Sequence, residues 1–317
     1  MTRLDSASAN AADVIAEEGL IGDPVPLWKQ TWQRLLRKRS GQVGLIIIGA
    51  LLLIALAAPV ISPYNPNDVL IGTEHVKRRE APCIHLLGCD LAKPQHIMGI
   101  DGNSRDVLSR VLHGTRVSLM IGLVTVTTAL VFGVLLGAIA GFFGGFADNI
   151  IMRIMDVILG FPSLLLAIAI VAVLGPGIVN ALLAISVVSM PAYARVTRAS
   201  VLSVKTLDFV AATRVLGGSR SRILFRRVLP NAITPIVVLA TLGIATAILD
   251  AAGLSFLGLG AQPPMPEWGT MLGTEKDQVF SAPHLVFFPG IAIMLTVLGF
   301  NLLGDGLRDA LDPRLNT

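Results

Sequence analysis

Few residues in this chain have the type and spacing that a disulfide, a metal site or a catalytic site requires. Cys83 and Cys89 stand in one polar stretch, and a separation of six residues permits a local disulfide bond. We predict this disulfide, and the alternative is a solvated insertion with two free thiols. Three histidines share the stretch, but their spacing fits no standard zinc pattern, so we predict no metal site. They are His75, His85 and His96.

Neither catalysis nor nucleotide binding is indicated. No Ser/His/Asp arrangement or pair of carboxylates has a spacing that favours catalysis, and we predict that the chain is not an enzyme. A Walker A loop holds nucleotide phosphates with backbone amides and a lysine that follows glycine, yet the chain has no Gly-Lys dipeptide. We therefore expect this chain to bind no cofactor.

A basic, helix-competent segment offers a different kind of site, one for contact with another protein. Phe209 to Leu216 can form two turns of helix, and Gly217 and Gly218 supply a stop. Ser219 can cap a second short helix that ends before Pro230. The pattern predicts a compact helix, turn and helix between two apolar stretches.

The elements around these residues are membrane spans. Hydrophobic residues make up 53% of the 317 positions and charged residues only 15%, which is more apolar material than one soluble core buries. A helix needs about 20 apolar residues to cross a bilayer. Six stretches qualify, and they are Val43 to Ile61, Ser118 to Phe142, Ile154 to Leu174, Ile178 to Tyr193, Ile233 to Phe256 and Leu285 to Leu303.

These runs are continuous and lack the alternation of barrel strands, so we predict an all-α integral membrane protein with about six transmembrane helices. Glycines within them predict close helix packing; examples are Gly122, Gly133, Gly137, Gly141 and Gly243. A net charge of +4 with 5% aromatic residues argues against nucleic acid as a partner.

Charge sets the expected orientation. Segment 194–230 carries many arginines against the single acid Asp208, and residues 1–42 contain a basic cluster beside Trp32. Basic loops stay in the cytoplasm, so we predict cytoplasmic N- and C-termini. The expected organisation is a cytoplasmic segment 1–42, a first span 43–61, an external loop 62–117, a five-helix domain 118–303 that includes loop 194–230, and a cytoplasmic tail 304–317.

The first span is expected to remain in the protein. Ala55 and Ala57 have the spacing of a signal-peptidase site, but the polar lead before the span is longer than a signal peptide allows.

Two acids lie within apolar stretches, where a buried carboxylate is costly and a functional role is a first hypothesis. Asp156 has Arg153 three residues earlier, and we predict that these two pair on one helix face. Asp250 lies close to the outer end of its stretch. A structural role is the favoured interpretation for both acids, and the alternative is that Asp250 lines the outer end of a path through the membrane.

The basic segment resembles the "EAA" loop of ABC importer permeases, whose pattern is Glu-Ala-Ala, three residues, Gly, nine residues, Ile, one residue and Leu-Pro. Its matching residues are Ala212, Gly217, Leu229 and Pro230. It departs from the pattern at Ala211, Thr213 and Arg227, where the family has Glu, Ala and Ile.

Three further blocks resemble the second permease of dipeptide, oligopeptide, glutathione and nickel importers. They are Gly99 to Arg110 with Gly114 to Ser118, Gly260 to Gly269, and Asn301 to Pro313. Ile100 and Ser104 replace the Thr and Gly usual in the first block. The resemblance runs from about residue 32 to the end, without residues 73–95.

The resemblance implies a type I ABC importer permease in a bacterial inner membrane. A sister permease would complete the path, two ABC ATPase subunits would supply energy, and an external substrate-binding protein would deliver the substrate. Peptides are the first expected substrate, with glutathione or nickel complexes as alternatives. The implied ATPase-coupling residues are Asp208, Ala211, Ala212, Arg214, Gly217, Leu229 and Pro230.

Two other classes compete with this interpretation. An ion-coupled secondary transporter favours several mid-membrane charges and inverted repeats, and neither is evident. A membrane-embedded enzyme needs clustered His, Asp or Glu at helix depth, and no histidine lies in the centre of a predicted span.

Overall fold

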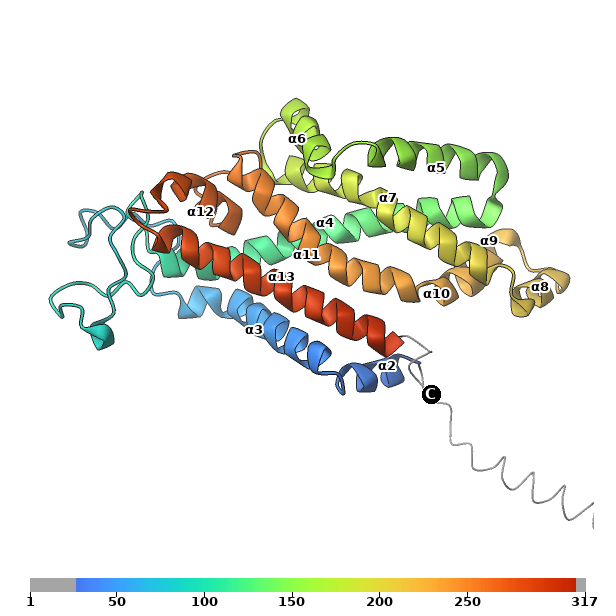
Figure 1. Ribbon diagram of the computed structural model, residues 1–317, viewed down its shortest axis with the longest axis horizontal. Helices are drawn as coiled ribbons and strands as arrows, with labels where there is room; N and C mark the ends of the chain where they lie inside the picture. The colour runs from blue at the N-terminus through green and yellow to red at the C-terminus, as the bar shows by residue number, and fades with distance from the viewer. Residues whose placement is uncertain (1–26, 312–317) are drawn as a thin grey trace, which may run out of the picture.

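Long helices dominate the computed structural model, which describes residues 27–311 (Figure 1). The longer helices are α2 (Leu27–Leu35), α3 (Arg39–Ile61), α4 (Val107–Phe143), α5 (Gly145–Leu159), α6 (Ser163–Leu174), α7 (Ile178–Val204), α11 (Thr234–Phe256) and α13 (His284–Leu311). Shorter pieces are η1 (His85–Leu87), α8 (Asp208–Val215), α9 (Arg220–Ile223), η2 (Leu224–Val228), α10 (Leu229–Ala232), α12 (Trp268–Glu275) and η3 (Lys276–Gln278). No strand forms in this part of the chain.

Five of these helices are long and apolar enough to cross a membrane, namely α3, α4, α7, α11 and α13. The sixth candidate is the pair α5 and α6, which bends by 92° between its two halves. The predicted span from Ile154 to Leu174 is therefore not one continuous helix. The break falls at Gly160 to Pro162, because proline lacks an N–H and disfavours helical backbone at the residue before it. Residues 145–153, which lie between two of the predicted spans, belong to α5.

Several helices run beyond the apolar stretches that predicted them. Helix α4 begins at Val107 rather than at Ser118, because the Asp106 carboxylate accepts the Ser109 N–H at 2.7 Å and caps the first turn. Helix α7 continues to Val204, and α13 continues to Leu311. The expected loops 62–117 and 194–230 are consequently partly helical. Hydropathy marks the apolar part of a helix, whereas caps and glycines mark its ends.

Close contact between α4 and α7 forms the centre of the bundle. A Cβ atom on Gly137 would collide with the Ala194 carbonyl oxygen, and one on Gly141 would lie 2.9 Å from the Arg198 carbonyl oxygen. Gly133 likewise faces Met190 and Tyr193. These glycines let two backbones approach closely, as the sequence predicted.

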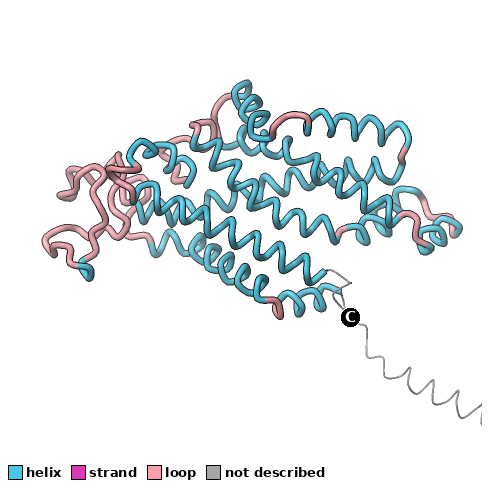
Figure 2. Tube along the Cα trace, viewed as in Figure 1, coloured by secondary structure: helices cyan, strands magenta, loops and turns pink. Residues whose placement is uncertain are grey.

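The two ends of the bundle differ in character. The long loop between α3 and α4 lies with α12 at one end, while α8, α9 and α10 lie at the opposite end (Figure 1). Most of the irregular backbone gathers at the α12 end (Figure 2). We call residues 62–106 together with α12 the outer end, and residues 205–233 the coupling segment, after the orientation and the role that the sequence predicts for them.

Candidate functional site

Local signals build the coupling segment. Helix α8 ends at Val215, and Gly217 follows with a φ of +79°, a conformation that glycine adopts without strain. The Ser219 hydroxyl then accepts the Arg222 N–H at 3.4 Å and caps α9. The predicted helix, glycine stop and serine cap are confirmed. The predicted end of the second helix before Pro230 is wrong, because η2 and α10 continue the helical backbone to Ala232.

Buried side chains attach this segment to the bundle. Val210 of α8 and Ile223, Leu224 and Val228 of the following helices are at most 1% exposed. They pack in one cluster with Ala138 of α4 and Val201 of α7. The segment is therefore packed against two long helices, and a displacement of α8 would have to move or break that packing.

The face of the same segment that points away from the bundle is exposed. Asp208, Ala211, Ala212, Arg214 and Gly217 are all exposed, which brings five of the expected coupling residues together on and beside α8. Leu229 and Pro230 lie in α10, where Leu229 is half-buried and Pro230 exposed.

An apolar tip that the motif did not identify completes this surface. Val215 and Leu216 are each 86% exposed at the end of α8. Apolar side chains presented together at such a tip are typical of protein interfaces. Their signal in the sequence was only their position immediately before the glycine stop.

Ion pairs hold α5 against α7 near the coupling segment. Arg198 of α7 makes two hydrogen bonds to Asp148 of α5, at 2.5 and 2.6 Å. Asp156 pairs with Arg195 of α7 at 2.6 Å, so the predicted partner Arg153 is wrong. Helix α5 packs against α7, and a cross-helix partner replaces the one on the same helix.

Asp250 remains a candidate for the path. It is half-buried in α11, near the end of that helix that faces α12. Within residues 27–311 its carboxylate has no hydrogen-bond or ion-pair partner. A carboxylate of this kind is costly in an apolar bundle unless it meets water or a substrate.

The sequence blocks 99–118 and 260–269 meet at the outer end, a contact that sequence reasoning missed. The Trp268 side chain is fully buried, and its indole N–H donates to the Val111 carbonyl oxygen at 3.0 Å. Arg110 donates to the carbonyl oxygens of Pro66 and Pro264 at 2.8 and 3.3 Å. The blocks thus form a clasp that joins the outer loop, α4 and the segment before α12.

A buried histidine strengthens the outer loop. The His96 Nδ1 lies 2.9 Å from an Asp106 carboxylate oxygen, and its Nε2 lies 3.2 Å from Glu74. Burial lowers the pKa of His96, but the hydrogen bonds and charges of Asp106 and Glu74 outweigh burial, so this pKa is raised. Within residues 27–311 no three His, Cys, Asp or Glu side chains are placed to hold a metal ion.

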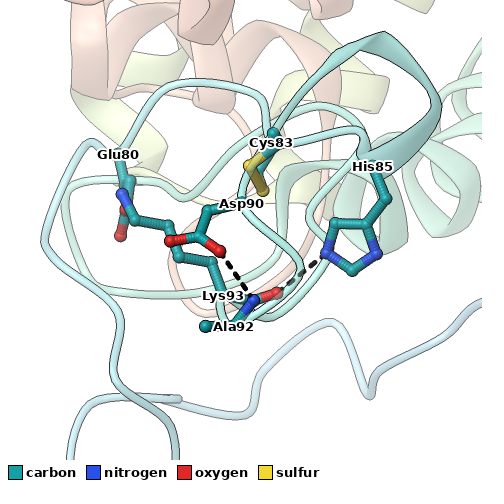
Figure 3. The surroundings of a disulfide bond; sticks show 7 residues. Glu80, Cys83, His85, Asp90, Ala92 and Lys93 are labelled. Carbon is teal, nitrogen blue, oxygen red and sulfur yellow. Dashed lines mark hydrogen bonds and ion pairs between the residues drawn. A yellow bond between two sulfur atoms is a disulfide. The ribbon is translucent and has the colours of Figure 1, made fainter.

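Cys83 and Cys89 are joined by a disulfide in this loop, with their Cα atoms 5.4 Å apart (Figure 3). Beside it, a His85 ring nitrogen lies 2.9 Å from the Lys93 carbonyl oxygen, and the Ala92 N–H donates to Asp90 at 3.0 Å. The Lys93 ammonium also pairs with Glu80 at 3.4 Å. The disulfide and these contacts hold together residues 80–93 of the loop.

Comparison with known proteins assigns the chain. Residues 133–317, more than half of it, match the family described as binding-protein-dependent transport system inner membrane component. Residues 26–82 match the N-terminal transmembrane domain of oligopeptide transport permease C.

Relatives cover almost the whole chain. The dipeptide transport system permease protein DppC of Alkalihalophilus pseudofirmus is 46% identical over 290 residues, which are 92% of this chain and 91% of that protein. The di/tripeptide transport system permease protein DppC of Pseudomonas aeruginosa is 47% identical over 92% of this chain and 93% of its own length. The glutathione transport system permease protein GsiD of Pectobacterium atrosepticum is 43% identical over 92% of both chains.

The fold has a solved counterpart in the MetNI methionine ABC transporter, in an inward-facing conformation. That match has a TM-score of 0.53 at 18% identity and covers 64% of this chain and 96% of the other. The part outside this match amounts to about a third of the chain. By family, relatives and fold together, the chain belongs to the binding-protein-dependent transport system inner membrane components, as a permease with the type I ABC importer fold.

Proposed function

We propose that this chain is one of two permease subunits through which a bacterial ABC importer passes dipeptides and tripeptides. The observation that carries the proposal is the near full-length similarity, at 46 and 47% identity, to permeases of dipeptide and di/tripeptide transport systems. A sister permease completes the path, and an external binding protein presents the substrate at the outer end. Asp250 faces that path at its outer part.

Energy arrives through the coupling segment. Two ATPase subunits bind ATP and Mg²⁺, and one of them receives the tip of α8. The proposal is supported by the contrast between the buried underside of the segment, at Val210 and Ile223, and its exposed tip, at Val215 and Leu216. A segment that is exposed on one face and packed on the other can transmit a movement of a bound partner to α4 and α7.

Uptake measurements test the function. We expect a strain that lacks this gene to lose uptake of labelled dipeptides and tripeptides, and to regain it when the full-length chain is restored. Glutathione is the second candidate substrate, because a relative that is 43% identical is a glutathione permease. Labelled glutathione and a nickel complex are therefore measured in parallel. Unchanged peptide uptake in the deletion strain, in the absence of other peptide importers, would contradict the proposal.

Labelling experiments test the orientation. We expect Arg78→Cys, in the outer loop, to react with an impermeant maleimide in intact cells, and Val215→Cys to react only after permeabilisation. Both positions are exposed, so a lack of reaction reports the membrane side and not burial. Cys83 and Cys89 are bonded to each other and contribute no free thiol. The reverse pattern would show that the coupling segment lies outside the cell.

A further inference from the structure

An apolar groove runs beside the coupling segment between α2, α11 and α13. Its volume is about 670 Å³, within the range of small-molecule sites. The lining includes Trp32 and Leu35 of α2, Val237 of α11, and Leu307 and Leu311 of α13. Trp32 is 49% exposed there, and tryptophan prefers the depth at which lipid headgroups meet hydrocarbon.

A basic hollow of about 690 Å³ adjoins this groove, and Pro230 stands in the wall of both. The hollow is lined by Arg222, Arg226 and Arg227, whose side chains are exposed. Across residues 27–311 no hydrogen-bond or ion-pair partner is found for these three guanidinium groups. Arg227 is also a departure from the coupling-loop pattern, which has Ile at that position.

The two hollows together are complementary to one amphipathic ligand, which has an anionic group and an apolar chain. Arginine binds phosphate oxygens with paired N–H donors, and three unpaired guanidinium groups favour a headgroup with net negative charge. The apolar groove begins at Pro230, within one helical turn of Arg227, and it can hold an acyl chain. A free phosphate has no such chain, so the groove favours a lipid over inorganic phosphate. Basic pockets between membrane helices on the cytoplasmic side are typical sites for anionic lipid headgroups.

We propose that this groove is a binding site for an anionic phospholipid, with the phosphate at Arg226 and Arg227 and an acyl chain along Trp32, Val237 and Leu307. The lipid bridges α2 to the base of the coupling segment. The site uses no residue of the path, so it does not depend on which substrate is imported. Its basic hollow borders the α8 tip, because Leu216 is part of the lining.

Photolabelling tests the site in the assembled transporter, purified through a tag on this chain and placed in phosphatidylcholine nanodiscs. The probes are phosphatidylglycerol and phosphatidylcholine with the same photoreactive acyl chain. We expect phosphatidylglycerol to label peptides from residues 31–45 and 230–237 at a lower mole fraction than phosphatidylcholine does. Arg226→Gln/Arg227→Gln should raise the half-saturating fraction of phosphatidylglycerol by about 10- to 30-fold.

Matched controls separate a site from general attraction to charge. Arg37→Gln/Arg39→Gln removes the same charge at exposed positions outside both hollows and should leave the labelling unchanged. Thr234→Trp fills the groove without touching the arginines and should abolish labelling by both lipids. Equal labelling of the wild type by the two lipids would mean that the probes report only contact with bulk lipid. No labelling would mean that another subunit covers the groove. Either result would overturn the proposal.

Discussion

Gly217→Val is expected to leave the permease in the membrane but to lower peptide uptake by about 5- to 30-fold. The φ of Gly217 is +79°, and a side chain in this left-handed conformation costs about 1–2 kcal/mol. A β-branched residue is at the upper end of that cost. A penalty of this size lowers the population of the productive turn by a factor of about 5–30. The tip at Val215 and Leu216 would then be presented in the wrong direction.

Steric clash is not the cause, which makes the control informative. A Cβ atom at position 217 meets no other atom within 4 Å, so only the backbone conformation is at stake. Asparagine tolerates positive φ better than other residues with side chains. We therefore expect Gly217→Asn to keep most of the uptake, and Gly217→Val to co-purify with less ATPase. Wild-type uptake by a Gly217→Val protein of normal abundance would exclude this segment as the coupling element.

Trp268→Ala is expected to be the most destabilising single change at the outer end, at about 3–5 kcal/mol. The side chain is fully buried, and removing it leaves a cavity beside Val111 and Gly114 together with an unpaired Val111 carbonyl. The measurement is the melting temperature of the detergent-solubilised, fluorescently tagged protein, read as loss of the monodisperse chromatographic peak. We expect a lower melting temperature and less protein in the membrane.

Two variants show which interaction is lost. Trp32→Ala removes the same residue type at a position that is 49% exposed, and should melt close to the wild type. Trp268→Phe keeps much of the apolar volume but loses the hydrogen bond to Val111. Its melting temperature should lie between those of the wild type and Trp268→Ala, because the carbonyl left without its donor costs about 1–3 kcal/mol. If Trp268→Ala melts with the wild type, the clasp does not hold the outer end together.

The sequence alone was sufficient wherever the determining signal is local. Continuous apolar runs predicted the long helices, because each run must be covered by lipid or by another helix. The glycine stop at Gly217 and the cap at Ser219 predicted the turn of the coupling segment, because both act within one helical turn. The family resemblance added the function, since peptide specificity leaves no readable pattern in an apolar span.

The tertiary structure decided what depends on neighbours distant in the chain. Asp156 pairs with Arg195 and not with Arg153 because α5 packs against α7, and no local rule reports that packing. Trp268 donates a hydrogen bond to Val111, which lies 157 residues earlier in the chain. The groove between α2, α11 and α13 exists only after three separate helices have packed. A helix end is set by a few adjacent residues, whereas a partner across the bundle is set by the packing of all the helices at once.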